Sequence, residues 1–185
     1  MDFWLHYRGK LKANGSIKHK HDIRKEFHNQ IKGLWQHEPL KTFPVKEGGT
    51  VTGELIKKVG NYKFVTLVIK GEKGTEIDLY AELDITILHA EPPGRIIQRG
   101  DTDNRLKTLF DALRYPENED EIPAGESQVD DYLYCLLEDD KLINRVNVLT
   151  DRLLDYKDPE EVLLLIHVTL KNKGRDTLWL HALGL

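Results

Sequence analysis

The chain has 185 residues, enough for one domain with a substantial hydrophobic core and short for two. Hydrophobic residues make up 39% of it and charged residues 31%, a composition that indicates a globular protein and excludes a disordered one. Its apolar runs fall well short of the ~20 residues that span a bilayer, and no basic leader with an apolar block opens the chain. Cys135 is the only cysteine, which excludes an internal disulfide. We therefore expect no membrane partner and a cytoplasmic location.

Charge is distributed unevenly along the chain, although the formal net charge is only −4. Residues 8–32 contain eight Lys or Arg against Asp22 and Glu26, whereas residues 117–140 contain ten Asp or Glu and no Lys or Arg. A basic arm and an acidic block suggest a polyanionic partner together with a cation site. The alternative is that both are solvated faces that attract each other.

In the first half of the chain, residues 3–11 are predicted to form a strand that ends at Asn14-Gly15. Residues 22–35 are predicted to form a helix with an apolar side made of Ile23, Phe27, Ile31 and Leu34. Two strands, at 63–70 and 76–88, are predicted to pair as a hairpin across the turn at 71–74. The second strand alternates apolar and polar residues, which indicates a half-buried antiparallel strand.

In the second half, a helix beginning at the motif described below is expected to stop near Tyr115-Pro116. Residues 116–127 are polar and acidic and indicate a surface loop, and 132–137 form a short apolar run. Residues 145–149 resemble a strand and 161–170 a buried strand. The order of elements predicts a single α+β domain, residues 1–185, with a mixed or mainly antiparallel sheet and helices packed on it.

Chemistry-bearing residues concentrate between positions 101 and 111. Asp101 and Asp103 stand at the entrance of the predicted helix, with Asp103 at the expected N-cap. Asp103, Lys107 and Asp111 recur every four residues and share one stripe of that helix. The neighbouring stripe is apolar and should face the core, with Leu106, Leu109, Phe110 and Leu113.

Two interpretations of this pattern stand side by side. An Asp at a helix N-cap binds the free N–H groups of the first turn, which explains Asp103 without any function. Carboxylates close together repel one another unless a cation neutralises them, and Mg²⁺ is satisfied by one or two carboxylates, waters and a phosphate oxygen. A cap does not explain Asp101, Lys107, Asp111 and the later Asp139-Asp140 pair together, and this set would suit a metal site for phosphodiester hydrolysis; spacing alone does not decide between the two interpretations.

The run Gly100-Asp-Thr-Asp-Asn-Arg-Leu-Lys-Thr-Leu-Phe-Asp-Ala-Leu, followed by Glu138-Asp-Asp-Lys and a short strand, resembles the RusA-like Holliday-junction resolvases of bacteria and phages. Those enzymes carry Asp-x-Asp-Asn-x-x-Lys, then Leu-Asp-Ala-Leu, then Asp-Asp, in that order. The resemblance covers residues 99–150, with a looser fit of a first strand, a basic loop and a helix before them. Relative to that family, residues 115–131 look like an inserted acidic loop.

The resemblance implies a homodimeric endonuclease that uses Mg²⁺, or alternatively Mn²⁺, to cut branched DNA such as Holliday junctions. It implies metal binding by Asp101, Asp103 and Asp140, which act in catalysis together with Lys107. The residues expected to orient these side chains without touching the metal are Asn104, Asp111 and Asp139, although a surface salt bridge would explain Asp111 equally well. The residues expected to contact the DNA backbone are Lys18, Lys20, Arg24 and Lys25.

Two other functions remain open at this point. One is a nucleic-acid-binding or regulatory module that kept the fold and lost catalysis. The other is a different metal-dependent phosphoryl or glycosyl enzyme that uses Asp-x-Asp. A phosphatase of the aspartyl-nucleophile type would place that motif directly after a buried apolar strand near the start of the chain. Here Gln98-Arg99-Gly100 precedes the motif, midway along the chain, so we rank the phosphatase last.

Overall fold

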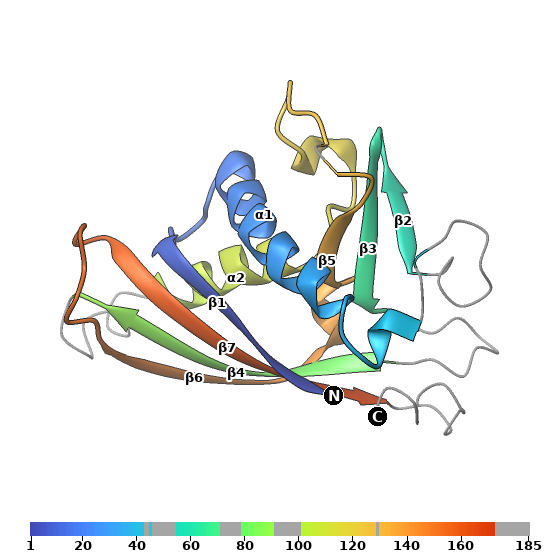
Figure 1. Cartoon of the computed structure of the whole chain (residues 1–185). Helices are drawn as coiled ribbons and strands as arrows, with labels where there is room; N and C mark the ends of the chain where they lie inside the picture. Colours follow the sequence, from blue (N-terminus) through green and yellow to red (C-terminus); the bar gives the residue numbers. More distant parts are fainter. Residues whose placement is uncertain (43–44, 46–54, 71–78, 91–100, 129, 173–185) are drawn as a thin grey trace.

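The larger of two mixed sheets runs along one side of the molecule (Figure 1). The computed structural model describes residues 1–42, 45, 55–70, 79–90, 101–128 and 130–172. Within them, the larger sheet has the order β1-β7-β4-β6, formed by β1 (Asp2–Lys10), β4 (Leu79–His89), β6 (Ile143–Arg152) and β7 (Glu161–Asn172). β7 pairs antiparallel with both of its neighbours, whereas β4 and β6 are parallel. The expected α+β domain is confirmed.

A smaller sheet stands beside α1, at an angle to the first (Figure 1). Its order is β2-β3-β5, made of β2 (Ile56–Val59), β3 (Tyr62–Val68) and β5 (Leu133–Leu137). β2 and β3 form an antiparallel hairpin, and β5 joins β3 in parallel. The predicted hairpin between 63–70 and 76–88 is therefore wrong, because β3 and β4 belong to different sheets; residues 71–78 lie outside the described part.

Two helices lie on one face of the larger sheet: α1 (Ile17–Leu34) and α2 (Asp101–Leu113). α1 contacts β1, β5 and α2, so it links the two sheets. Short 3-10 helices follow at η1 (Leu40–Thr42), η3 (Glu119–Glu121) and η4 (Asp140–Leu142). No helix in the described part of the chain is long and apolar enough to cross a membrane.

Alternating side chains of the larger sheet build the core beneath the helices. On β4 the predicted alternation is confirmed, with every second residue from Leu79 to Ile87 at most 2% exposed. β7 also buries only one face, so the fully buried strand expected at 161–170 is half-buried instead. Leu109 and Leu113 of α2 are buried on this core, while Leu106 and Phe110 pack at its margin, as the helical spacing predicts.

α1 begins five residues earlier than its apolar pattern indicates. Ser16 caps it, because its hydroxyl accepts a hydrogen bond from the backbone N–H of His19 at 3.2 Å. Gly15 just before the cap donates its N–H to the Thr108 hydroxyl of α2 at 2.9 Å. A Cβ on Gly15 would lie 2.7 Å from Thr108 Cγ2, so only glycine allows this approach of the two helices.

Candidate functional site

The Asp-x-Asp motif lies in the first turn of α2 rather than before it. The helix begins at Asp101, so Asp103 is its third residue and the predicted N-cap position for Asp103 is wrong. Carboxylates in a first turn are favoured by the free N–H groups and the positive end of the helix dipole. Asp103 is exposed, whereas the side chain of Asp101 lies outside the described part.

The stripe Asp103, Lys107 and Asp111 runs down α2 from solvent into the protein. Asp103 and Lys107 are exposed, and Asn104 between them is half-buried, but Asp111 is only 9% exposed. Eight residues of helix separate Asp103 from Asp111, a distance of about 12 Å along the axis. The inner end of the stripe is therefore the part that lies against other elements.

The late carboxylate pair is brought next to that inner end. β5 delivers the chain to η4, where Asp139 is the N-cap and Asp140 the first residue, and η4 contacts α2. A backbone bridge between Arg114 and Leu137 fixes the end of α2 beside the end of β5. Residues 29 positions apart in sequence, Asp111 and Asp140, thus contribute charge to the same site.

The neighbouring carboxyls of Asp139 and Asp140 shift each other's pKa in opposite directions. The pKa of Asp140 is raised, first by partial removal of its carboxyl from water, then by the adjacent Asp139 carboxyl and its negative charge. The pKa of Asp139 is lowered: its own partial burial acts against this, but the backbone N–H of Lys141, the adjacent Asp140 carboxyl and the Lys141 charge outweigh it. Asp111 pushes the Asp140 pKa up as well, while Arg114 acts in the opposite direction. Such a crowded carboxylate is the kind of group that a bound cation would relieve.

Two cations hold Asp111 in place. Lys20 reaches across from α1, with its Nζ 2.6 Å from Asp111 Oδ2. Arg114, one turn along α2, places a guanidinium nitrogen 3.4 Å from Asp111 Oδ1 and also pairs with Glu121 at 3.1 Å. A salt bridge for Asp111 is therefore confirmed, although the residue is buried rather than at the surface, and its supporting role in a catalytic site stays a prediction.

Arg24 occupies a position that does not suit the predicted phosphate contact. It is 2% exposed, and its guanidinium donates to the carbonyl oxygens of Asp111 at 2.6 Å and Arg114 at 2.9 Å. These are carbonyls at the end of α2 that lack partners within the helix. Arg24 thus joins α1 to the end of α2, and we remove it from the expected nucleic-acid contacts.

The other three expected phosphate contacts remain at the surface or near it, but each has an acidic partner within the chain. Besides Lys20, these are Lys18, whose Nζ lies 3.5 Å from a Glu126 oxygen, and Lys25, which also bonds to Glu126. Glu126 belongs to the acidic segment, which we define as residues 115–131. The alternative that the basic arm and the acidic block attract each other is therefore confirmed for Lys18 and Lys25, whereas Lys20 pairs with Asp111, which lies outside the acidic block.

Among residues whose side chains are described, no three His, Cys, Asp or Glu lie close enough to hold a metal ion. Two carboxylates, Asp139 and Asp140, lie together, and the donor chemistry fits Mg²⁺, which needs only one or two carboxylates beside water and phosphate oxygens. Asp103 is not grouped with this pair: it lies at the exposed end of α2, about 12 Å along the helix axis from Asp111.

Sequence reasoning missed Arg114, which pairs with the carboxylates of Asp111 and Glu121, and the link from Lys20 to Asp111. Arg114 could have been suspected from its place three residues after Asp111, where side chains of a helix meet. The contact of Lys20 with Asp111 has no local signal, since it joins two helices separated by 66 residues.

Comparison of the chain with protein-family models, with curated proteins and with solved structures finds no match in any of the three.

Proposed function

We propose that this protein is a Mg²⁺-dependent endonuclease, with Mn²⁺ as an alternative ion, that hydrolyses phosphodiester bonds in branched DNA such as Holliday junctions. The observation that carries the proposal is the meeting of η4 with α2, which sets the Asp139–Asp140 pair beside the stripe that ends in Asp111. The motif in the first turn of α2 supplies the remaining proposed ligands, Asp101 and Asp103.

Each side chain would then have a distinct task. Asp140, with a raised pKa, gains most from a nearby cation, and Asp139, fixed as the N-cap of η4, would support it from the adjacent position. Lys107 is exposed one turn from Asp103 and would stabilise negative charge that grows on the phosphate. A bound Mg²⁺ would polarise the phosphate and lower the pKa of a bound water. Asp111 and its cationic partners would hold the inner end of α2 against α1.

Assembly as a homodimer in the cytoplasm is part of the same proposal. β6 is an edge strand, and its side chains are exposed on both faces, with Val146 and Val148 facing the core side and Leu149 the outer side. An exposed edge of this kind can pair with a second chain. Light scattering coupled to size exclusion would give the mass of a dimer; a monomer at all concentrations up to tens of micromolar would count against this part.

The test of the function is cleavage of end-labelled four-way junction, linear duplex and single-stranded DNA in Mg²⁺ and in Mn²⁺. Asp103→Asn is the inactive variant, and Asp120→Asn, an exposed carboxylate of the acidic segment, is the charge-matched control. We expect paired nicks on the junction from wild type and from the control, and none from Asp103→Asn. Cleavage by Asp103→Asn at the wild-type rate would show that the assigned site is wrong.

The alternative is a nucleic-acid-binding or regulatory module of the same fold. It is favoured by one observation: in the described part of the chain no group of three metal ligands is assembled. The same substrate panel separates the two, because the alternative expects binding of DNA with no cleavage in any ion.

A further inference from the structure

A regular stripe of basic side chains follows α1 on the side that faces the acidic segment. Three lysines are spaced seven residues apart, and a histidine follows each of the first two lysines by three positions. The five residues are Lys18, His21, Lys25, His28 and Lys32. Positions three, four and seven apart lie on one side of a helix, so the five form one line about 21 Å long. We call this line the basic stripe.

Two carboxylates of the acidic segment lie on the basic stripe. Glu126 contacts Lys18, Lys25 and His21, with its oxygens 3.5 Å from Lys18 Nζ and 3.6 Å from His21 Nε2. Asp130 contacts the residues of α1 that lie seven positions later, with its carboxylate 2.8 Å from both His28 Nε2 and Lys32 Nζ. The lysines lower the pKa of both carboxyls, so both are ionised at neutral pH.

Both histidines have Nε2 on the side of these carboxylates. His21 Nδ1 lies 3.2 Å from an Arg24 nitrogen, and because a guanidinium can only donate, Nδ1 accepts and the proton of the neutral ring sits on Nε2. His28 repeats the pattern, since its Nδ1 accepts from the backbone N–H of Tyr134 at 2.9 Å. In both rings the Nε2–H therefore points toward an acidic residue of the segment.

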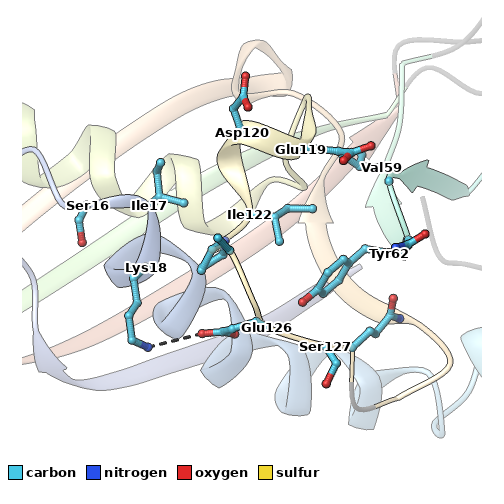
Figure 2. A pocket seen from close by; sticks show the side chains of 15 residues that line it. Ser16, Ile17, Lys18, Val59, Tyr62, Glu119, Asp120, Ile122, Glu126 and Ser127 are labelled. Atoms are coloured by element: carbon cyan, nitrogen blue, oxygen red, sulfur yellow. Dashed lines mark ion pairs between the residues drawn. The ribbon is translucent and has the colours of Figure 1, made fainter.

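The position around Glu126 has more donors than its carboxylate satisfies. His21 is fully buried and Tyr62 is 7% exposed, yet His21 Nε2 and the Tyr62 hydroxyl have no hydrogen-bond partner. Tyr62 extends from the turn between β2 and β3 toward Glu126, while Lys18 approaches from the start of α1 (Figure 2). Buried donors without a partner are costly, so their presence here indicates a site shaped for a larger anion than one carboxylate.

The acidic segment also has contacts on either side of Glu126, in addition to those that Glu126 makes with the basic stripe. Before it, Glu121 pairs with Arg114; after it, the Gln128 side chain bonds the backbone N–H and carbonyl of Lys63 at 2.8 and 3.1 Å. Between these anchors the segment borders two hollows, of about 1000 Å³ and about 200 Å³. The flanking contacts do not involve the Glu126 side chain, so they do not depend on its pairing with the basic stripe.

We propose that the donors around Glu126 form a phosphate-binding site for the nucleic-acid backbone, and that Glu126 occupies this site until a backbone phosphate displaces it. This inference rests on the proposed function for its ligand. The tetrahedral oxygens of a phosphate present acceptors in more directions than the planar carboxylate, so they can reach Tyr62 and His21 as well as both lysines. The Asp130 position, about 10 Å along the helix, is a second anion position on the same stripe.

The test is equilibrium binding without cleavage, measured in EDTA for wild type, Glu126→Gln and the charge-matched control Asp131→Asn. The probes are a fluorescent four-way DNA junction and inorganic tripolyphosphate, which separate a backbone phosphate from a free one. We expect Glu126→Gln to bind the junction at least tenfold more tightly than Asp131→Asn does near physiological salt. Freeing Lys25 should also steepen the dependence of log affinity on log salt by about 1, because Lys18 keeps its ion pair with Asp22 at 3.0 Å.

A second substitution assigns the gain to the basic stripe. Lys25→Met in the Glu126→Gln background should reverse most of the gain, whereas Lys12→Met, which removes an exposed lysine outside α1, should not. Thermal melting of each variant confirms that it is folded.

The outcomes separate this inference from the proposed function. Equal junction affinities for Glu126→Gln and Asp131→Asn would overturn the inference, even if the wild type cuts DNA. A gain for tripolyphosphate alone would also overturn the nucleic-acid ligand and leave a site for free phosphate. A gain for the junction in a protein that cuts nothing would support the phosphate site and count against the endonuclease.

Discussion

Acidification should destabilise this protein through His21. The ring is fully buried, and its pKa is lowered to about 4, mainly by burial and further by the charges of Arg24 and Lys25. In the unfolded chain an exposed histidine has a pKa of about 6.5. Between these two values the unfolded chain binds more protons than the folded one, so stability rises with pH and is lost as pH falls through this window.

The expected size follows from the two pKa values. Lowering the pH from 7 to 5 protonates His21 almost fully in the unfolded chain and only slightly in the folded protein, which costs about 2 kcal/mol of unfolding free energy. Urea unfolding at both pH values measures this loss, with His21→Gln as the variant and His37→Gln, at an exposed position, as the control. The wild type and the control should lose about 2 kcal/mol more than His21→Gln.

If all three proteins lost the same free energy, the reasoning about His21 would be refuted. An NMR titration of the wild-type ring provides the same test without any substitution: the His21 signals should not shift between pH 7 and pH 5.5. A midpoint near 6.5 would show that the ring is accessible to water, in conflict with its burial.

Two further predictions concern the helices around the candidate site. Arg24→Met should lower the unfolding free energy, measured in urea, by about 2–4 kcal/mol, because two carbonyls at the end of α2 lose a charged donor. The salt dependence of DNA binding should stay unchanged. Undiminished stability together with a salt slope shallower by about 1 would instead assign Arg24 to the DNA. Asp140→Asn should raise the melting temperature at pH 7, because the raised pKa means that the ionised carboxylate is disfavoured in the folded protein. This advantage over wild type should vanish as pH falls and Asp140 takes up a proton. A variant that melts lower than wild type at pH 7 and at the same temperature at pH 4 would contradict the crowding of carboxylates.

Much of the larger sheet and of α2 could be predicted from the sequence because their residues repeat the pattern of one buried face. β4 alternates without interruption from Leu79 to Ile87, and α2 places Leu109 and Leu113 on the core. Such patterns depend only on local spacing, so they survive without knowledge of the partners.

The errors arose where local spacing carries no information about partners. β3 is buried along most of its length and pairs with β5, some 70 residues later, and an apolar run alone does not show this. The start of α1 was placed too late because Ile17–Asp22 is mostly basic or histidine, and its buried members, such as His21, do not look apolar.

In the candidate site, too, the features set by local spacing could be predicted and those set by distant contacts could not. The stripe of Asp103, Lys107 and Asp111 followed from helical spacing, and their alignment on one helix is confirmed. That Glu126 would lie on the lysines of α1 could not be deduced, since about 100 residues separate them and only opposite charge suggested a contact. Buried Arg24 was mistaken for a surface residue because charged side chains are seldom buried unless they are paired.

The most direct test of the central claim is single-turnover cleavage of a four-way DNA junction in Mg²⁺ by wild type and by Asp140→Asn, with junction binding measured in Ca²⁺. Asp140 lies where η4 meets α2, and the proposed metal depends on it. The account predicts that Asp140→Asn binds the junction within about threefold of wild type and cuts it at least a thousandfold more slowly. Cleavage by Asp140→Asn at a rate close to that of wild type would contradict the assignment of a catalytic metal site to this part of the fold.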